Sequence, residues 1–301
     1  MKLINSKYEI IEQEPGLEGI YKAIERAGRT CYKSEDKITD TSAKEFVDRM
    51  IKSGHGAMLE HGTVYLGRPV FPDIGLNGGY SYETDGFYKK YIDNKFSHVE
   101  VKPFKWSGED GCYVTTNLRV LVENNWLDDL QYICEPTEYH ERRVTVHFVC
   151  DRGVSHEFVR HRVFSFAQES TRYCNYSKDK FGNELTFITP GWFNKNAIVG
   201  EYNKKNYSLY SKHLENEFPN VLYEIEIEKI NEDTKERIPW SAEDWFIHSL
   251  RMSEVSYFKL LDRAIKCRTN FLIRDKITPQ MARQVLPNAL KTEINMWGFI
   301  S

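Results

Sequence analysis

The sequence predicts an α+β fold in which helices dominate, and three patterns carry this prediction. Apolar residues recur at helical spacing in several segments, and strict alternation marks a half-buried strand. Strands and helices do not alternate regularly, as they would in a doubly wound sheet. With 301 residues the chain is long enough to bury a sizeable core, as one large domain or two modest ones.

Two helices are predicted near the N-terminus. The first runs from Gly16 to Ala27, where Leu17, Ile20, Tyr21 and Ile24 form an apolar stripe, and we expect the following GRTCYKS to break it. The second runs from Thr41 to Ser53, begins with a Ser-x-x-Glu pattern and ends before Gly54, a natural C-terminal glycine. A short strand is then predicted at TVYLGRPVF, residues 63–71.

The segment from about residue 72 to 141 has the weakest pattern. Glycines and turn residues at 72–86 predict a loop, and TTNLRVLVENNW, residues 115–126, fits a helix or a strand. Because clear patterning returns just after this segment, we interpret residues 72–141 as an insertion into the domain.

Three elements are predicted in the C-terminal half. Alternation through Val144, Val146 and Phe148 indicates a half-buried strand, and a turn at 151–153 leads into a helix opened by Ser155. On that helix His156 and Arg160 would share one face at a spacing of four residues.

A long amphipathic helix is predicted to begin at Ser241, with a core stripe of Phe246, Leu250, Ser253, Tyr257, Leu261 and Ala264. A compact helix at ITPQMARQVLP would take Thr278 as N-cap and Pro279 at its first position, and end at Pro287.

Composition limits the functional classes. A formal net charge of -3 argues against a general polyanion binder, so a basic patch must be local. The apolar runs are too short to span a membrane, and MKLINSKYEIIEQE lacks the apolar core of a signal peptide, so we expect a cytoplasmic protein. The six cysteines form no CxxC pair, which favours free thiols and disfavours zinc.

A cluster of basic residues stands out in RHRVFSFAQESTRY. Four basic side chains lie within thirteen positions and alternate with hydroxyl groups: Arg160, His161, Arg162 and Arg172, with Ser165, Ser170, Thr171 and Tyr173. Guanidinium forks match phosphate oxygens, and hydroxyl and amide groups complete a cradle for an anion. The alternative is a solvated basic face that pairs with the carboxylates of Glu157, Glu169 and Asp179.

The order Arg-His-Arg, seven residues, Ser, one residue, Arg-Tyr resembles the signature of the flavin-dependent thymidylate synthases. Three other segments are similar to that family in the expected order: ERAGRTCYKS, GHGAMLEHGTVYL and TPQMARQVLPNALKTEINMWG. The resemblance implies a single helix-rich α+β domain over residues 1–301 with a central antiparallel sheet. It leaves 72–141 and 194–240 unsupported.

The resemblance also implies a set of site residues. Those near FAD would be Cys31, His55, Glu60, Arg160, His161, Arg162, Val163 and Gln168. Those near dUMP would be Glu157, Arg160, Gln168, Ser170, Thr171, Arg172 and Arg283. Arg160, Ser170 and Arg172 would be the catalytic group, with an arginine beside the uracil ring and Ser170 binding substrate without acting as a nucleophile.

The reaction implied by the resemblance is the reductive methylation of dUMP to dTMP, a step of nucleotide biosynthesis. Methylenetetrahydrofolate would donate the methylene group and NADPH the reducing equivalents, through FAD. Family members assemble as homotetramers with sites shared between subunits, so we expect the same here, with neither nucleic acid nor membrane as partner.

The sequence departs from the family pattern in two places. Glu157 stands where the family often has a glutamine that reaches the nucleotide. After Gly298 the family continues with a flavin-binding and nucleotide-binding segment, which the sequence to Ser301 does not contain, so we expect incomplete sites on this chain. Two alternatives therefore stay open: a truncated or split-gene, non-catalytic FAD- or nucleotide-binding fragment, and a nucleic-acid-binding domain, which the net charge disfavours.

Overall fold

The computed structural model describes residues 2–69, 73–74, 80–81, 87–102, 111–172, 174, 176, 185–191, 229–230, 237–238, 242–266, 282–283 and 286–299. Its centre is a four-stranded sheet in the order β2 (Lys7–Ile11), β8 (Arg143–Asp151), β13 (Lys291–Phe299) and β9 (Ser165–Gln168). All three pairings are antiparallel. The predicted α+β class with a central antiparallel sheet is confirmed.

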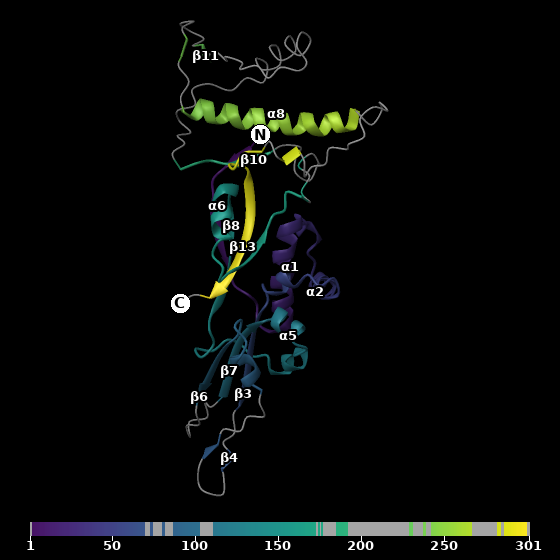
Figure 1. Ribbon diagram of the computed structural model, residues 1–301, viewed down its shortest axis with the longest axis vertical. Coiled ribbons are helices and arrows are strands. Elements are labelled where there is room, and N and C mark those ends of the chain that lie inside the picture. Colours follow the sequence, from purple (N-terminus) through teal and green to yellow (C-terminus); the bar gives the residue numbers. More distant parts are fainter. Residues whose placement is uncertain are drawn as a thin grey trace.

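A second sheet lies beyond the end of the central sheet at which β13 ends (Figure 1). Its three antiparallel strands follow the order β3 (Thr63–Pro69), β7 (Gly111–Asn117) and β6 (His98–Lys102). The ambiguous segment 115–126 is both strand and helix, because Asn117 ends β7 and its Oδ1 accepts the N–H of Val120 at 3.1 Å. That cap starts α5 (Leu118–Glu123).

Several elements of segment 72–141 contribute to the core. Val114 of β7 and Leu118 and Leu121 of α5 are fully buried, together with Val64 and Leu66 of β3. The segment therefore completes the second sheet. That it is an insertion relative to other proteins stays a prediction.

Short elements complete the described chain. They are β1 (Lys2–Ile4), which pairs in parallel with β10 (Thr186–Ile188), the two-residue strands β4 (Asp73–Ile74), β5 (Tyr80–Ser81), β11 (Lys229–Ile230) and β12 (Arg237–Ile238), the helices α3 (Gly56–Leu59) and α4 (Lys89–Ile92), and the 3-10 helices η1 (Glu35–Lys37) and η2 (Leu127–Tyr132).

Helix α1 (Gly16–Tyr32) is longer than predicted, because the break comes near the end of GRTCYKS and not at its first residue. Gly28 does not end the helix but lets α2 (Ser42–Lys52) approach, since a Cβ there would lie 2.3 Å from Cζ of Phe46. The helix ends at Lys33, whose φ of 47° is left-handed. The bounds predicted for α2 are confirmed within one residue, and Gly54 beyond it has a φ of +67°.

Helix α6 (Arg152–Phe158) begins earlier than predicted because the Oδ1 of Asp151 caps it, accepting the N–H of Val154 at 2.9 Å. Ser155 lies inside the helix and donates to the carbonyl of Arg152 at 3.0 Å. Since α6 ends at Phe158, Arg160 lies outside it, and the prediction of a shared helical face with His156 is wrong.

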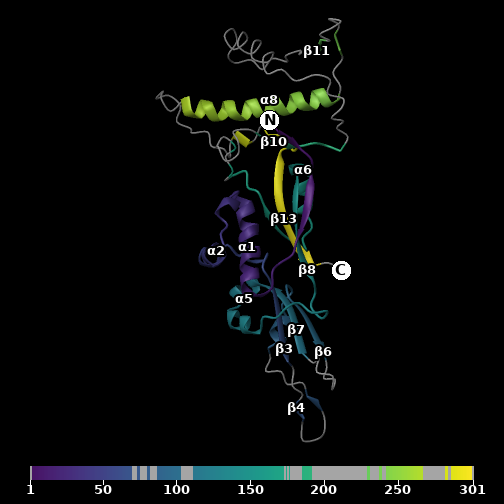
Figure 2. The same cartoon turned by 180° about the vertical axis from the view of Figure 1, so that it is seen from behind.

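Helix α8 (Ala242–Lys266) lies across the end of the molecule opposite the second sheet (Figure 2). As predicted, Leu250 and Tyr257 are buried and Phe246 packs beside them; they meet Phe187 and Leu290 in a second apolar cluster. The side chains of Leu261 and Ala264, and the predicted cap at Thr278 and Pro279, lie outside the described residues. Over the described part of the chain, no helix combines the length and apolar character that crossing a bilayer requires.

The close approach of α1 and α2 makes Gly28→Ala a test of packing. Although alanine favours helix by up to about 1 kcal/mol, the added methyl would collide with Phe46, and we expect a net loss of about 1–3 kcal/mol. Urea unfolding would measure it. Gly191→Ala is the control, because nothing lies within 4 Å of a Cβ at Gly191; equal stability of both variants would contradict the packing role.

His61 makes stability depend on pH. Burial lowers its pKa from 6.5 to about 4, because the charged form loses its hydration. The unfolded chain therefore binds the proton first, and stability falls as the pH drops from 6.5 towards 4, by about 3 kcal/mol. Urea unfolding at a series of pH values should show this loss in the wild type and a shallower one in His61→Gln. Parallel pH curves would contradict the assignment.

Candidate functional site

Strand β9 divides the basic segment in two. The residues before Ser165 form a turn at the end of the central sheet where β13 finishes, because Ser165 pairs with Trp297. The residues after Gln168 lie towards the start of β13, because Gln168 pairs with Ile294. A four-residue strand is about 13 Å long, so one chain does not bring the two halves of the segment together.

The first half is an exposed cationic turn, which comprises Arg160, His161, Arg162 and Val163. Nη1 of Arg160 lies 2.9 Å from Oε2 of Glu157, and the two side chains are 75% and 65% exposed. An ion pair so open to water contributes little, so an anionic ligand could displace Glu157. The alternative of a basic face paired with carboxylates is thus correct for Glu157; Asp179 lies outside the described residues.

Glu60 and His55, which the resemblance places near the flavin, differ in their burial and in their hydrogen bonds. Glu60 is partly buried, and its carboxylate accepts hydrogen bonds from Ser165 at the start of β9 and from Arg119 of α5. His55 is exposed at the N-terminus of α3, and its side chain makes no capping hydrogen bond. The structure therefore ties Glu60 to β9 directly.

The second half is packed against α1. The N–H of Ser170 donates to the carbonyl of Cys31 at 3.0 Å, and the hydroxyl of Ser170 accepts the N–H of Arg172 at 3.3 Å. Burial raises the pKa of the Cys31 thiol to about 11, so it stays protonated at neutral pH. The Arg172 side chain is exposed.

Gln168 and Arg283 join this half to other elements. Nε2 of Gln168 donates to Ser155 of α6 at 2.8 Å and to Thr292 of β13 at 3.2 Å. Nη1 of Arg283 donates to the hydroxyl of Thr171 at 2.6 Å. Five of the expected residues therefore gather at this end of β9, namely Cys31, Gln168, Ser170, Thr171 and Arg283.

A charged network that sequence reasoning missed anchors the same turn. Glu169 is 2% exposed and pairs with Lys291, at 3.0 Å, and with the hydroxyl of Tyr176, at 3.1 Å. Glu293 pairs with Lys291 and Lys33, each at 2.5 Å. Although burial alone would raise the pKa of Glu293, these two ammonium groups hold it near 2. Glu169 thus binds a lysine of β13, so the alternative in which it pairs with the arginines of the basic segment is wrong.

Polar residues recur at every second position in KTEINMWG, and this alternation could have indicated the network. Lys291, Glu293 and Asn295 project from the same face of β13. Asn295 continues the row, since its Nδ2 donates to Thr30 of α1 at 3.0 Å and its Oδ1 lies 2.8 Å from Nδ1 of His147. No comparable periodicity indicated Arg119.

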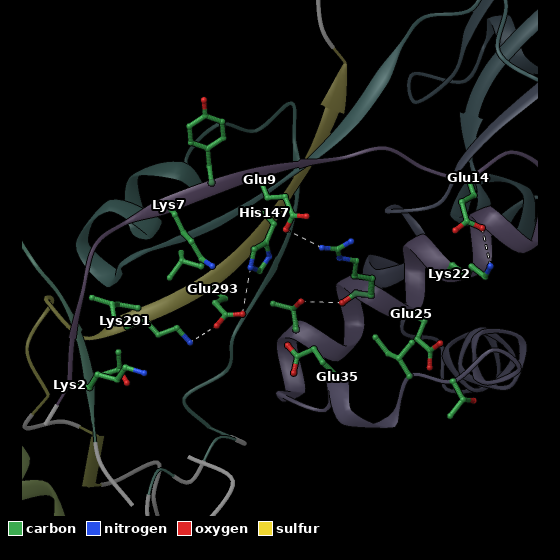
Figure 3. A pocket seen from close by; sticks show the side chains of 18 of the residues that line it. Lys2, Lys7, Glu9, Glu14, Lys22, Glu25, Glu35, His147, Lys291 and Glu293 are labelled. Atoms are coloured by element: carbon green, nitrogen blue, oxygen red, sulfur yellow. Dashed lines mark hydrogen bonds and ion pairs between the residues drawn. The ribbon is translucent and has the colours of Figure 1, made fainter. Parts of the chain in front are cut away.

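A cleft of about 1000 Å³ opens between α1 and this face of the sheet. Figure 3 shows Glu293 between Lys291 and His147, and Arg26 of α1 pairs with Glu9 of β2 at 3.2 Å. Charges of both signs line it, and none of the residues that the resemblance assigns to FAD or dUMP does. The cleft and the basic segment are therefore separate features.

These features define an α+β protein with hydrogen-bond donors for anions at both ends of one strand. The chain belongs to the thymidylate synthase complementing protein family, whose model matches residues 137–298, more than half of the chain. Membership supports a thymidylate synthase-like enzyme. The match includes the basic segment, β9, the described residues around Arg283, and nearly all of β13.

The solved structures that match include two crystal structures of a UMP/dUMP methylase, PolB from Streptomyces cacaoi, bound with 5-Br dUMP or 5-Br UMP. Both are 12% identical in sequence and are matched over 99% of this chain, with TM-scores of 0.30 and 0.31 over 75% and 74% of their own chains. Similarity at this level is too low to assign a ligand. No curated protein matches the chain.

Removing Lys291 should destabilise the protein strongly. Lys291→Met leaves the carboxylates of Glu169 and Glu293 buried with less compensation, and breaking such a pair costs about 3–5 kcal/mol. Thermal and urea unfolding would measure the loss. Lys102→Met is the matched control, because its ion pair with Glu100 is more open to water, with both side chains 38% exposed, and should contribute less than about 1 kcal/mol.

If Lys291→Met does not fold, Lys291→Met combined with Glu169→Gln should recover part of the stability, because it removes one uncompensated charge. A Lys291→Met protein as stable as its control would contradict the role of the network.

Proposed function

We propose that this protein is a flavin-dependent thymidylate synthase, which converts dUMP to dTMP with methylenetetrahydrofolate as methylene donor and NADPH as reductant through FAD. One observation carries the proposal: Arg283 and Thr171, 112 residues apart in the sequence, are joined by a hydrogen bond of 2.6 Å. They belong to two separate segments that resemble this family, so their contact supports one shared site.

The turn after β9 has the chemistry of a phosphate site. Arg283 and Arg172 are cationic, Ser170 and Thr171 offer hydroxyl groups, and Gln168 adds an amide. Arginine binds phosphate bidentately, and charge-assisted hydrogen bonds are the stronger ones. We assign these residues to dUMP, and Ser170 to binding without a covalent role.

The turn before β9 carries hydrogen-bond donors that suit a flavin dinucleotide. Arg160, His161 and Arg162 are exposed and cationic, as a pyrophosphate requires, and Val163 is an apolar surface, 69% exposed, for a ring system. His55 and Glu60 would add contacts on this side of β9. Cys31 and Gln168, which lie at the other end of the strand, would contact the flavin from a neighbouring subunit. Bound FAD would supply the hydride that reduces the transferred carbon.

The protein would act on the uracil ring by electrostatics. Negative charge builds up on the carbonyl oxygens as C5 becomes nucleophilic, and a fixed guanidinium of Arg160 or Arg172 would stabilise it. Glu157 limits this role of Arg160 because it shares the same guanidinium at 2.9 Å. Substrate binding must therefore displace Glu157 or use Arg172 for the ring.

The distance along β9 favours a site shared between subunits. The two ends of β9 lie about 13 Å apart in one chain, farther than a single uracil ring can bridge. We propose a homotetramer in which the turn before β9 of one subunit faces the turn after β9 of another. The site would work in the cytoplasm, on small molecules alone.

Absorption spectroscopy tests the proposal directly. The purified chain is mixed with FAD and passed through gel filtration, and tritium release from C5-labelled dUMP is then measured with folate and NADPH. A flavin band on a tetramer-sized peak with tritium release is the expected result. A flavin band without tritium release would indicate the non-catalytic binding fragment, and a colourless, inactive protein would overturn the proposal.

Arg283→Gln should weaken dUMP binding about 10- to 100-fold, the equivalent of one hydrogen bond to a charged group. Isothermal titration calorimetry with FAD present would measure the dissociation constant. Arg142→Gln is the control, since Arg142 is 73% exposed and pairs only loosely, at 3.5 Å, with Glu12. Equal dUMP affinity in the two variants would remove Arg283 from the site.

A further inference from the structure

Arg119 is a cation that neither the family resemblance nor the family match includes, since the match begins at residue 137. It lies in the first turn of α5. Its Nη1 lies 2.5 Å from Oε1 of Glu60, and its Nε donates to Oε1 of Glu123 at 2.7 Å. The guanidinium therefore holds Glu60 from one side.

The second oxygen of Glu60 is used as well. Oε2 accepts a short hydrogen bond from the hydroxyl of Ser165, the first residue of β9. Each oxygen of one carboxylate thus binds a different element, α5 on one side and β9 on the other. We name Arg119, Glu60 and Ser165 the α5–β9 clamp.

The backbone fixes the position of Arg119. Asn117 pairs with Thr63 of β3 and caps α5 through its side chain. The N–H of Leu118 donates to the carbonyl of Gly62 at 3.0 Å, close to Glu60 in the chain. Gly56 makes room for the guanidinium, because a Cβ at Gly56 would lie 3.0 Å from Nε of Arg119.

The clamp acts on the turn that precedes β9. Residues 160–163 are exposed and contribute few packing contacts of their own. The next two residues are both held in place, since Ser165 is bound to Glu60 and the ring of Phe164 lies where a Cβ of Gly298 would be, at 2.1 Å. The N–H groups of Arg160 and His161 tie the start of the turn to the last residues of α6. The position of its other end depends on Ser165.

We propose that Arg119 is a positioning residue: acting through Glu60 and Ser165, it holds the turn 160–163 in place to receive the pyrophosphate of a flavin dinucleotide. The ligand rests on the proposed function, whereas the effect on the turn does not. The segment from which Arg119 comes, 72–141, then has a role at the site besides completing the second sheet.

Hydrogen–deuterium exchange on the flavin-free protein tests the effect on the turn. In Arg119→Leu, amides of residues 160–168 should exchange about tenfold faster, because the turn opens without global unfolding. Arg142→Leu removes the same charge from an exposed pair and should leave that peptide unchanged. Unchanged exchange in Arg119→Leu, with the fold intact, would overturn the proposal.

Flavin binding tests the route through Glu60. Fluorescence titration with FAD should give a dissociation constant about tenfold higher for Arg119→Leu and for Glu60→Gln, no further loss in the double variant, and partial recovery in Arg119→Lys. Additive losses would mean that Arg119 acts independently of Glu60, and would overturn the route. An Arg119→Leu variant that binds FAD as tightly as the wild type would also overturn the route.

The two experiments separate the two claims. If the wild type binds no FAD, the proposed flavin chemistry fails, and faster exchange in Arg119→Leu still supports the clamp. If the wild type binds FAD and the turn exchanges equally in both proteins, the clamp fails while the proposed function stands.

Discussion

The antiparallel pairing of β8 with β13 is the constraint on which the rest of the structure depends. It joins nine pairs of residues, from Arg143 with Phe299 to Asp151 with Lys291, across about half of the chain. Because β13 also pairs with β9, the strand from the C-terminal region sets the register of the basic segment. Both turns that carry the candidate site are therefore placed by a strand that holds none of the predicted site residues.

Charge on one face of β13 extends this constraint to α1 and to the turn after β9. Lys291 and Glu293 form a compact group with Lys33 and Glu169, and Asn295 reaches Thr30. Burying several charges is favourable only when each is compensated by a partner. The network consequently fixes α1, β13 and the turn at Glu169 relative to one another, and through Glu169 it places the neighbouring Ser170 and Thr171.

The sequence predicted the elements whose patterns depend on neighbours along the chain. The stripe of α2, the strand β8 and the described part of the stripe of α8 are found. In β8, however, the neighbours Val149 and Cys150 are the buried residues, so burial does not follow one alternating face. Prediction from the sequence failed where a residue typical of a helix end serves a contact with another part of the structure. Gly28 looked like a helix end but serves a helix–helix contact, and Ser155 looked like a cap although Asp151 supplies it.

By itself the sequence determined the α+β class, the family resemblance and the identity of the basic segment, because these depend on residue order and spacing. Only the tertiary structure decided how that segment is divided by β9, which carboxylate each cation meets and that Arg119 reaches Glu60. Such pairings join residues far apart in the sequence, and a hydrogen bond depends on distance in space. Spacing along the chain cannot specify that distance until the strands have found their register.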